Sequence, residues 1–466
     1  MIDLPYNPFG KKVDDILCGD LEILKDVAEG WYVEYKSINM PVKSIAKSLA
    51  AFANHFGGLI FYGIKGAQGT NVAEAFIGLN AQEIISMIEN LRNAAKDSIN
   101  PVPYYEYNIL NGPCEKIDLP EGQAILMVIV PSGVNTPYVH GDGRIYRRVA
   151  DASDPKPETD RFILDQLWER RRKAEDTLTE FLNSRPVVSK DEENIPLLHI
   201  FLSQDPTYMP QALSNLEFDD FAQIMSNENL VTNKTLSIAL DNCYTASGGF
   251  IGRHLFNNKP DHLALTWKHL KNGSSIISVP LHTYSFFVGI DENFPKGYKY
   301  SQKFLQELGG RGYQRRTCTI LDVNPIFAEI ASFITQHKLL VEKGGFSGTI
   351  FAKAALEYIW RTIPFLDTEN FLNFIQKHGI PVIQDDETYC PPGTNFQSLI
   401  KVDYSIQDDQ TALASQIIRS AELFAHILRA LGVPPKIVFN EENEWVEAVF
   451  RSIDIIKNVS DLSNNE

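Results

Sequence analysis

The stretch that decides the fold is Ser48-Leu49-Ala50-Ala51-Phe52-Ala53-Asn54-His55-Phe56-Gly57-Gly58-Leu59-Ile60-Phe61-Tyr62-Gly63-Ile64. Its first half continues an apolar pattern, with spacings of three and four, that begins at Val42. This spacing predicts an amphipathic helix ended by Gly57-Gly58. The run from Leu59 to Ile64 is uninterrupted and apolar, which is typical of a strand buried on both faces. The stretch therefore predicts a helix that leads directly into a central strand.

The flanking sequence continues the mixture of helices and strands. Alternation from Trp31 to Lys36 predicts a strand before the helix. After the buried strand, Asn80 followed by Glu83 has the spacing of a capping box and predicts the start of a second helix. Further strands are expected at residues 104–110, 124–130 and 144–149. We therefore expect residues 1–157 to form one α+β domain.

The rest of the chain is predicted to hold a linking helix and a second domain. The helix runs from Glu158 to Asn183, inside a linking segment 158–186 that ends at Pro186. Asn272-Gly273 between two alternating apolar runs predicts a hairpin. Further helices are expected at residues 324–339, 352–360, 369–377, 409–431 and 440–457. The fold class is thus α+β throughout, with a second α+β domain at 187–457 and a disordered tail at 458–466.

The composition narrows the class of protein. Hydrophobic residues make up 44% and charged residues 22% of the 466 residues, as in folded globular proteins, which excludes disordered, collagen-like and coiled-coil chains. Apolar runs such as Ala124 to Val130 are too short to cross a membrane. The N-terminus lacks the pattern of a signal peptide, so we expect a cytoplasmic protein. The five dispersed cysteines are expected to be reduced thiols.

Charge and motifs exclude several functions. A net charge of −16 argues against binding nucleic acid over the whole surface but leaves room for a local basic strip. The sequence holds no GxxxxGK[ST] loop and no GxGxxG turn between a strand and a helix. It also lacks the HExxH and GxSxG motifs of metalloproteases and serine hydrolases.

Two carboxylates and a lysine form the first candidate site. Glu29 and Glu34 flank the start of the first strand, and Lys36 shares the strand face of Glu34. Two carboxylates on one face can hold a divalent cation such as Mg²⁺ or Mn²⁺, and an adjacent lysine can bind a phosphate. The spacing alone favours an ordinary Glu–Lys pair at a solvated edge, with the metal site as the alternative.

A basic strip forms the second candidate site. Arg144, Arg147 and Arg148 lie on one short strand around Tyr146, a pattern suited to phosphates and a stacked base. Lys43 and Lys47 share one face of the first helix because they are four residues apart. The alternative is a solvated stripe balanced by neighbouring aspartates.

The order of these motifs resembles the Schlafen AlbA_2 domain family. Glu34-Tyr35-Lys36, the block from Ser48 to Ile64, and the closing Pro137-Tyr138, Gly143 and Tyr146-x-Arg148 are similar to the family pattern over roughly residues 15–155. The resemblance implies a nucleic-acid-binding fold, described in some members as ATP-binding and found in bacterial regulators and defence proteins. In the vertebrate branch the same fold is a metal-dependent endoribonuclease.

The resemblance also implies roles for single residues. The catalytic Glu-x4-Glu-x-Lys of the nuclease branch corresponds to Glu29, Glu34 and Lys36, with the two glutamates as Mg²⁺ or Mn²⁺ ligands. The third acid is missing, because Lys65-Gly66 follows Gly63-Ile64 where that branch carries aspartate. Glu74 in the next loop is the candidate substitute. The resemblance therefore supports binding of RNA or DNA more strongly than cleavage.

Three functions remain as hypotheses. The first is a nucleic-acid-binding protein of a bacterial defence or regulatory system, with ribonuclease activity as a subordinate possibility. The second is a nucleotide- or effector-binding regulator in which Gly57-Gly58 and the loop from Lys65 to Asn71 cradle a phosphate. The third is an assembly module of a defence complex. Because one basic strip gives little affinity, we also expect a homodimer formed through the helix at 158–183.

Overall fold

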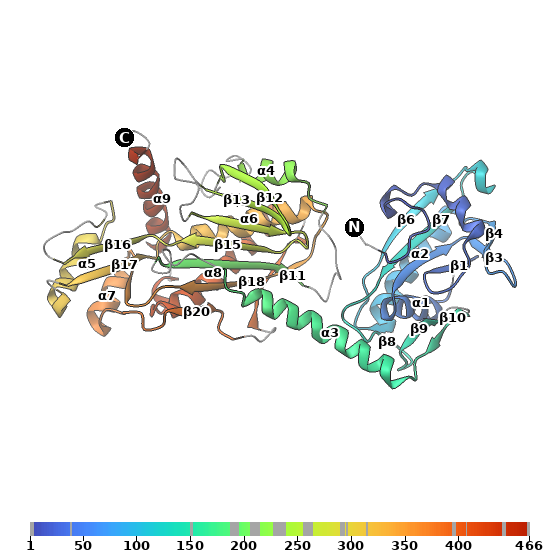
Figure 1. The fold of residues 1–466 in the computed structure, drawn as a ribbon, viewed down its shortest axis with the longest axis horizontal. Coiled ribbons are helices and arrows are strands. Elements are labelled where there is room, and N and C mark those ends of the chain that lie inside the picture. The colour runs from blue at the N-terminus through green and yellow to red at the C-terminus, as the bar shows by residue number, and fades with distance from the viewer. Residues whose placement is uncertain are drawn as a thin grey trace. The chain divides into compact units, whose positions relative to one another are not determined.

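The computed structural model describes most of the chain (Figure 1). The described residues are 4–37, 40–149, 152–186, 195–205, 215–226, 239–254, 264–288, 294, 297–313, 316–393, 398–406, 408–439 and 444–463. The chain divides into two compact units, with unit 1 extending to Leu178 and unit 2 beginning at Thr179. Helices and strands alternate in both units, which confirms the predicted α+β class.

Unit 1 is built on a four-stranded sheet in the order β1-β2-β7-β6. Strand β1 (Val33–Lys36) pairs in parallel with β2 (Gly57–Tyr62), and the two are joined by helix α1 (Val42–Asn54). The other strands of this sheet are antiparallel. The remaining elements of unit 1 are β3 (Ile64–Gly66), β4 (Ala73–Phe76), α2 (Ala81–Ser98), β5 (Ile99–Asn100), β6 (Glu106–Asn111), β7 (Ala124–Pro131), β8 (Val139–His140), β9 (Tyr146–Val149), β10 (Ala152–Pro157) and α3 (Arg161–Leu182), the last of which continues into unit 2.

Two hydrophobic cores cover the two faces of this sheet. Helices α1 and α2 pack on one face, where Leu49 and Leu91 lie against Leu126. The short 3-10 helices at Val13–Asp15 and Cys18–Asp26 cover the other face, where Leu21 lies against Phe61. Strand β2 is buried along its whole length, as its uninterrupted apolar run predicts. Its side chains supply both cores, which is why the stretch from Ser48 to Ile64 decides the fold.

The predicted capping box at the start of α2 is confirmed. The Asn80 side chain accepts a hydrogen bond from the Glu83 N–H at 3.0 Å, and the Glu83 carboxylate accepts one from the Asn80 N–H at 2.8 Å. The reciprocal pair satisfies two N–H groups at the helix start.

Unit 2 contains a large antiparallel sheet in the order β12-β13-β14-β15-β11-β18-β20, with β21 also paired to β18. A separate sheet has the order β16-β17-β19. The elements are β11 (Leu197–Gln204), α4 (Phe218–Ser226), β12 (Asn242–Ala246), β13 (Gly249–Arg253), β14 (Thr266–Leu270), β15 (Ser275–Pro280), β16 (Thr283–Phe287), α5 (Ser301–Leu308), β17 (Thr317–Asp322), α6 (Ile326–Lys343), β18 (Thr349–Glu357), β19 (Thr362–Phe365), α7 (Glu369–His378), β20 (Glu387–Cys390), β21 (Ile400–Asp403), α8 (Asp409–Ala430) and α9 (Glu444–Ser463).

Most predicted elements of unit 2 are present, and one is wrong. The hairpin at Asn272-Gly273 joins β14 to β15, as predicted. The helix expected at 352–360 is instead the second half of β18, the strand that pairs with β11 along its length. This strand is buried on both faces, so it shows no alternation, and its alanines favour a helix by local propensity. Helix α9 continues to Ser463, past the predicted end at Lys457.

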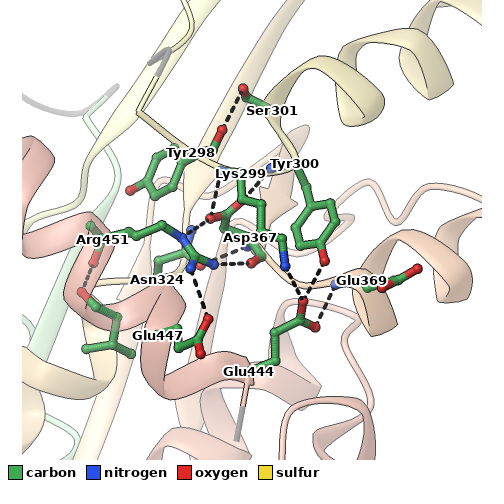
Figure 2. Close-up of polar contacts among 12 residues, drawn as sticks. Tyr298, Lys299, Tyr300, Ser301, Asn324, Asp367, Glu369, Glu444, Glu447 and Arg451 are labelled. Carbon is green, nitrogen blue, oxygen red and sulfur yellow. Dashed lines mark hydrogen bonds and ion pairs between the residues drawn. The ribbon is translucent and has the colours of Figure 1, made fainter. Parts of the chain in front are cut away.

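An arginine–carboxylate cluster fastens α9 to the rest of unit 2 (Figure 2). Arg451 of α9 donates to the Asp367 carboxylate at 2.7 Å and to the Asp367 carbonyl at 3.1 Å. The same carboxylate accepts the N–H groups of Lys299 and Tyr300 at 3.1 and 2.7 Å. Glu444, also on α9, accepts the Tyr300 hydroxyl at 2.7 Å. Main chain and side chains together therefore satisfy Asp367.

The structure bears on two predictions, that the cysteines are reduced and that the apolar runs are too short to cross a membrane. All five cysteines are free thiols. Within the described residues, no helix combines the length and the apolar character needed to cross a bilayer.

Candidate functional site

Strand β1 points Glu34 and Lys36 towards helix α1. Tyr35, between them, lies in the core on the opposite face of the sheet. The Glu34 carboxylate is fully buried and accepts the Ser48 hydroxyl of α1 at 2.9 Å and the Lys36 ammonium at 2.8 Å, both on Oε1. The predicted shared face of Glu34 and Lys36 is therefore present, and it is an interior face with Lys36 near its edge.

Arg148 completes this buried cluster. Its Nη1 donates to Glu34 Oε2 at 3.0 Å, and its Nε donates to the Gly30 carbonyl at 2.9 Å. Its guanidinium also lies 4.9 Å from the centre of the Phe52 ring. We call Glu34, Lys36 and Arg148 the buried cluster. Because a buried carboxylate costs several kcal/mol unless it is paired, the two cations hold β1, α1 and β9 together through one charge.

Glu29 lies next to the buried cluster but is held separately. Its carboxylate accepts the Tyr35 N–H at 2.6 Å, so it curls back towards β1 as its sequence position suggests. Burial raises the pKa of the Glu29 carboxyl, while the bond from Tyr35 and the charge of Lys36 act in the opposite direction. Glu29 thereby fixes the turn into β1 at Gly30.

The donor set around Glu29 and Glu34 does not fit a divalent cation. Both oxygens of Glu34 are occupied by cationic or hydroxyl donors. Lys65 stands at the position of the missing third acid and forms an ion pair of 2.7 Å with the exposed Glu74, the candidate substitute. Among the described residues, no group of three or more His, Cys, Asp or Glu side chains is placed to hold a metal.

The predicted basic strip divides between the two faces of β9. Arg148 is fully buried against α1 and is not available to a ligand at the surface. Arg147 points to the opposite face and forms an ion pair with Glu158. The prediction that both arginines share one exposed strip with Arg144 is therefore wrong, because neighbouring residues of a strand point to opposite faces.

A smaller basic group remains around Tyr146. Lys47 of α1 lies with its ammonium 5.1 Å from the centre of the Tyr146 ring. Lys43 is one helical turn earlier, and Arg144 precedes Tyr146 in the turn before β9. We call Lys43, Lys47 and Arg144 the basic patch. In the part of the chain that the structure describes, none of the three has a carboxylate within ion-pair distance.

Tyr146 is oriented by its own hydrogen bond. Its hydroxyl donates to Asp142 at 2.7 Å, and this bond is the main reason that the pKa of the Asp142 carboxyl lies below its usual range. The ring packs edge-on against His140 at 5.4 Å. The ring is largely buried, so it supports Lys47 rather than offering an open face for a stacked base.

Asn54 has a structural role that the sequence did not reveal. Its buried amide donates to the carbonyls of Tyr138 and Tyr146 at 2.8 and 3.1 Å and accepts the Tyr138 N–H at 2.7 Å. The end of α1 is thereby joined to the segments that lead into β8 and β9. The sequence signal that could have indicated this link is an asparagine at the last position of an otherwise apolar helix.

Gly57 and Gly58 serve backbone packing rather than phosphate binding. A Cβ at Gly57 would lie 2.6 Å from the Val130 carbonyl, and one at Gly58 would lie 2.4 Å from the Tyr32 carbonyl. Both glycines also have positive φ. The close neighbours leave no room for a phosphate, so the hypothesis of a phosphate cradle at Gly57-Gly58 has no support in the geometry.

Part of unit 1 matches a known protein family. Residues 29–157 match the family model described as Schlafen, AlbA_2. No curated protein matches the chain.

Two solved structures resemble the chain in part. The N-terminal domain of a RecG-related protein from Nitrosomonas europaea is 21% identical, and the match covers 31% of this chain and 96% of that one, with a TM-score of 0.22. The DIP2311 protein from Corynebacterium diphtheriae is 18% identical, and the match covers 33% of this chain and 31% of that one, with a TM-score of 0.21.

Proposed function

We propose, from the premise that residues 29–157 form a Schlafen AlbA_2 domain, that this protein binds nucleic acid through the basic patch of unit 1. The observation that carries the proposal is the patch itself. On a chain with a net charge of −16, Lys47 lies over the Tyr146 ring, with Lys43 one helical turn before it and Arg144 two residues before Tyr146. Among the described residues none of the three side chains forms an ion pair, although the Asp142 carboxylate accepts the Arg144 N–H and the Tyr146 hydroxyl. Side-chain cations without an ion-pair partner attract phosphates, and each phosphate contact releases about one counterion.

We propose binding without metal-dependent cleavage at Glu29, Glu34 and Lys36. A catalytic role would require the Glu34 carboxylate to leave Ser48 and Arg148 and to coordinate a metal instead. Within this proposal the buried cluster has a positioning role, because it holds β1 and β9 against α1 and thereby keeps the basic patch together.

Binding is tested by measuring the affinity for labelled oligonucleotides at several salt concentrations. The triple variant Lys43→Gln/Lys47→Gln/Arg144→Gln should flatten the slope of log affinity against log salt by about two to three units. The control variant Lys377→Gln/Arg419→Gln/Lys436→Gln removes the same charge from exposed positions of unit 2 and should leave the slope unchanged. Equal slopes for the triple variant and the wild type would show that the patch does not contact phosphates.

Cleavage is tested in the same samples. Transfer RNA and plasmid DNA incubated with the wild type and Mn²⁺ should stay intact. Metal-dependent cleavage that is lost in Glu29→Gln/Glu34→Gln would restore the nuclease hypothesis and show that Glu34 changes its partners when substrate binds.

We also propose that the protein forms a homodimer through helix α3. The helix exposes two large aromatic side chains, Phe162 and Trp168, with 66% and 57% of their surface accessible. Exposed aromatic side chains on one helix favour an interface. Light scattering at micromolar concentration should give twice the chain mass of 52.5 kDa. The monomer mass would contradict the dimer. A defence-system partner and a ligand of unit 2 stay predictions.

A further inference from the structure

Five aromatic side chains of unit 1 form a continuous row, which we call the aromatic row: Tyr6, Tyr32, Phe56, Trp31 and His55. The ring centres of Tyr6 and Tyr32 are 5.3 Å apart, those of Tyr32 and Phe56 5.8 Å, and those of Phe56 and Trp31 5.6 Å. The planes within each of these pairs are inclined by 30° or less. His55 lies edge-on to Trp31 at 5.4 Å.

The aromatic row is at the surface. Tyr6 and Trp31 are each 39% exposed and Phe56 is 37% exposed. A single exposed aromatic side chain needs no explanation, but a gathered group of them marks a binding surface. The rings come from three separate segments of the chain, so the row is a product of the fold rather than of local sequence.

The backbone beneath the row is tightly packed. The Tyr32 carbonyl accepts the Leu59 N–H at 2.7 Å. Gly58 lies so close to the same carbonyl that a Cβ there would be 2.4 Å from it. The segment from His55 to Gly58 is therefore held against β1, and the rings of Trp31 and Phe56 keep their arrangement without a ligand. A surface arranged in advance loses less conformational entropy on binding.

One partly exposed arginine borders the row. Arg170 of α3 donates to the His55 carbonyl at 3.2 Å. Arg148 donates to the Gly30 carbonyl at 2.9 Å, but it is buried and paired with Glu34 and supports the backbone only. Burial and then the charges of Arg147 and Arg170 lower the pKa of the His55 imidazole to about 4. His55 is therefore neutral at pH 7, and the cation that contacts its backbone is Arg170.

We infer that the aromatic row is a stacking platform for unpaired nucleobases, so that the preferred ligand is single-stranded RNA or DNA; this rests on the nucleic-acid binding proposed above. Every base has a π face, and stacking on aromatic rings is tolerant of sequence. A duplex hides those faces, whereas a single strand presents them. A proline-rich peptide also packs on aromatic rings, but it lacks the negative charge that Arg170, beside His55, attracts.

One strand can reach both the aromatic row and the basic patch. Lys43 lies in the first turn of α1, and His55 directly follows its end. At 1.5 Å per residue the two positions are about 18 Å apart along the helix. The backbone phosphates then lie at the basic patch while the bases at the other end of α1 stack on the row.

The test measures affinities for a labelled single strand of about 12 nucleotides and for a hairpin duplex of the same base composition. Trp31→Ala and Phe56→Ala should each weaken single-strand binding about 5-fold to 100-fold and leave duplex binding unchanged, because stacking contributes only where bases are unpaired. Trp31→Phe should retain most of the affinity. The control Trp360→Ala removes an equally prominent tryptophan, 49% exposed, from unit 2 and should change neither affinity. Circular dichroism and the melting temperature show that each variant is folded.

The outcomes separate this inference from the proposed function. Wild-type protein that binds neither oligonucleotide overturns both. Wild-type protein that binds both, with folded Trp31→Ala and Phe56→Ala variants of unchanged single-strand affinity, overturns the stacking platform alone. Folded variants that lose affinity for a proline-rich peptide but keep their affinity for the single strand would assign the row to a protein ligand and also overturn the inference.

Discussion

Each unit contains a fully buried carboxylate bound by an arginine, and the two pairs are held in different ways. The Glu34 carboxylate of unit 1 is bound by three side chains, those of Ser48, Lys36 and Arg148. Asp367 of unit 2 is bound by two main-chain N–H groups in addition to Arg451. The first pair therefore depends on three side chains, whereas the second is built into the backbone.

The surroundings of the two pairs also differ. Asp367 and Arg451 are bordered by further carboxylates, Glu444 and Glu447 (Figure 2). The buried cluster of unit 1 is next to the basic patch, whose three side-chain cations form no ion pair among the described residues, although Asp142 accepts the Arg144 N–H. Burial and ion pairing are alike in both places, so neither identifies a ligand site. The charge at the surrounding surface distinguishes them and favours anion binding in unit 1.

The largest expected effect is the loss of Arg148. Arg148→Met leaves the Glu34 carboxylate buried with Lys36 as its remaining cation and should destabilise unit 1 by about 3–5 kcal/mol. Glu34→Gln/Arg148→Met should recover part of this loss because the unpaired charge is gone. Urea unfolding measures the change, and hydrogen exchange in β1 and β2 assigns it to unit 1. A single variant as stable as the wild type would show that side chains do not hold this region.

The next effect is a pH dependence in unit 2. Burial, and then the charge of Asp322, raises the pKa of Glu329 to about 7, and burial raises the pKa of Asp322 to about 6. The folded state therefore holds these protons more tightly than the unfolded state. Stability should fall as pH rises from about 4.5 to 7, by about 3 kcal/mol for Glu329.

This pH dependence is measured by urea unfolding of the Glu329→Gln variant. The variant should match the wild type most closely below about pH 4.5 and be more stable at pH 8. The control Glu342→Gln alters a more exposed carboxylate of the same helix and should follow the wild type at both pH values. A wild-type stability that rises between pH 5 and 7 would contradict the sign.

A smaller effect is expected at Asp367. Asp367→Asn keeps one acceptor oxygen, for the Tyr300 N–H, and replaces the oxygen that accepts the Lys299 N–H and Arg451 by an amide NH2 group. It also removes the charge that binds Arg451. Because Arg451 is 25% exposed and also contacts Glu447, the loss should be about 1–3 kcal/mol. Oligonucleotide affinity should not change. An altered oligonucleotide affinity in this variant would contradict the proposal that nucleic acid binds near the pair in unit 1 and not near the pair in unit 2.

The smallest effect on stability is expected at Arg144. This residue is exposed and four positions before Arg148, so Arg144→Gln should change the free energy of unfolding by less than about 0.5 kcal/mol. The same variant should reduce the salt slope of oligonucleotide binding by about one unit. Within one segment of five residues, Arg144 would then affect nucleic-acid binding, whereas Arg148 would affect stability.

The fold of unit 1 could be predicted from sequence because its signals are local. The capping box at Asn80 and the apolar run of β2 each depend on neighbouring residues. The error at β18 has the opposite origin. That strand is central, so tertiary pairing with β11 overrides the helical preference of its alanines.

The candidate site was only partly predictable. The pattern Glu34-x-Lys36 correctly placed both side chains on one face of β1. It did not reveal that Arg148, 114 positions later, would bind Glu34 and bury both charges. Nor did it reveal the aromatic row, because Tyr6, Trp31 and Phe56 come from segments that only the folded chain brings together. These contacts join residues that are far apart in the sequence, so the spacing of neighbouring residues does not reveal them.

The Asn54 amide has a consequence for the newly made chain on the ribosome. Its partner carbonyl at Tyr146 is 92 residues further along, and β7, the antiparallel neighbour of β2, begins at Ala124, well before that carbonyl is made. At about 5–20 residues per second, synthesis of those 92 residues takes about 5–20 s. In the first part of that interval the apolar strand β2 has left the ribosome without β7 and can associate with other nascent chains. Chaperones that cover short apolar strands therefore have an opportunity to act on β2 before β7 emerges.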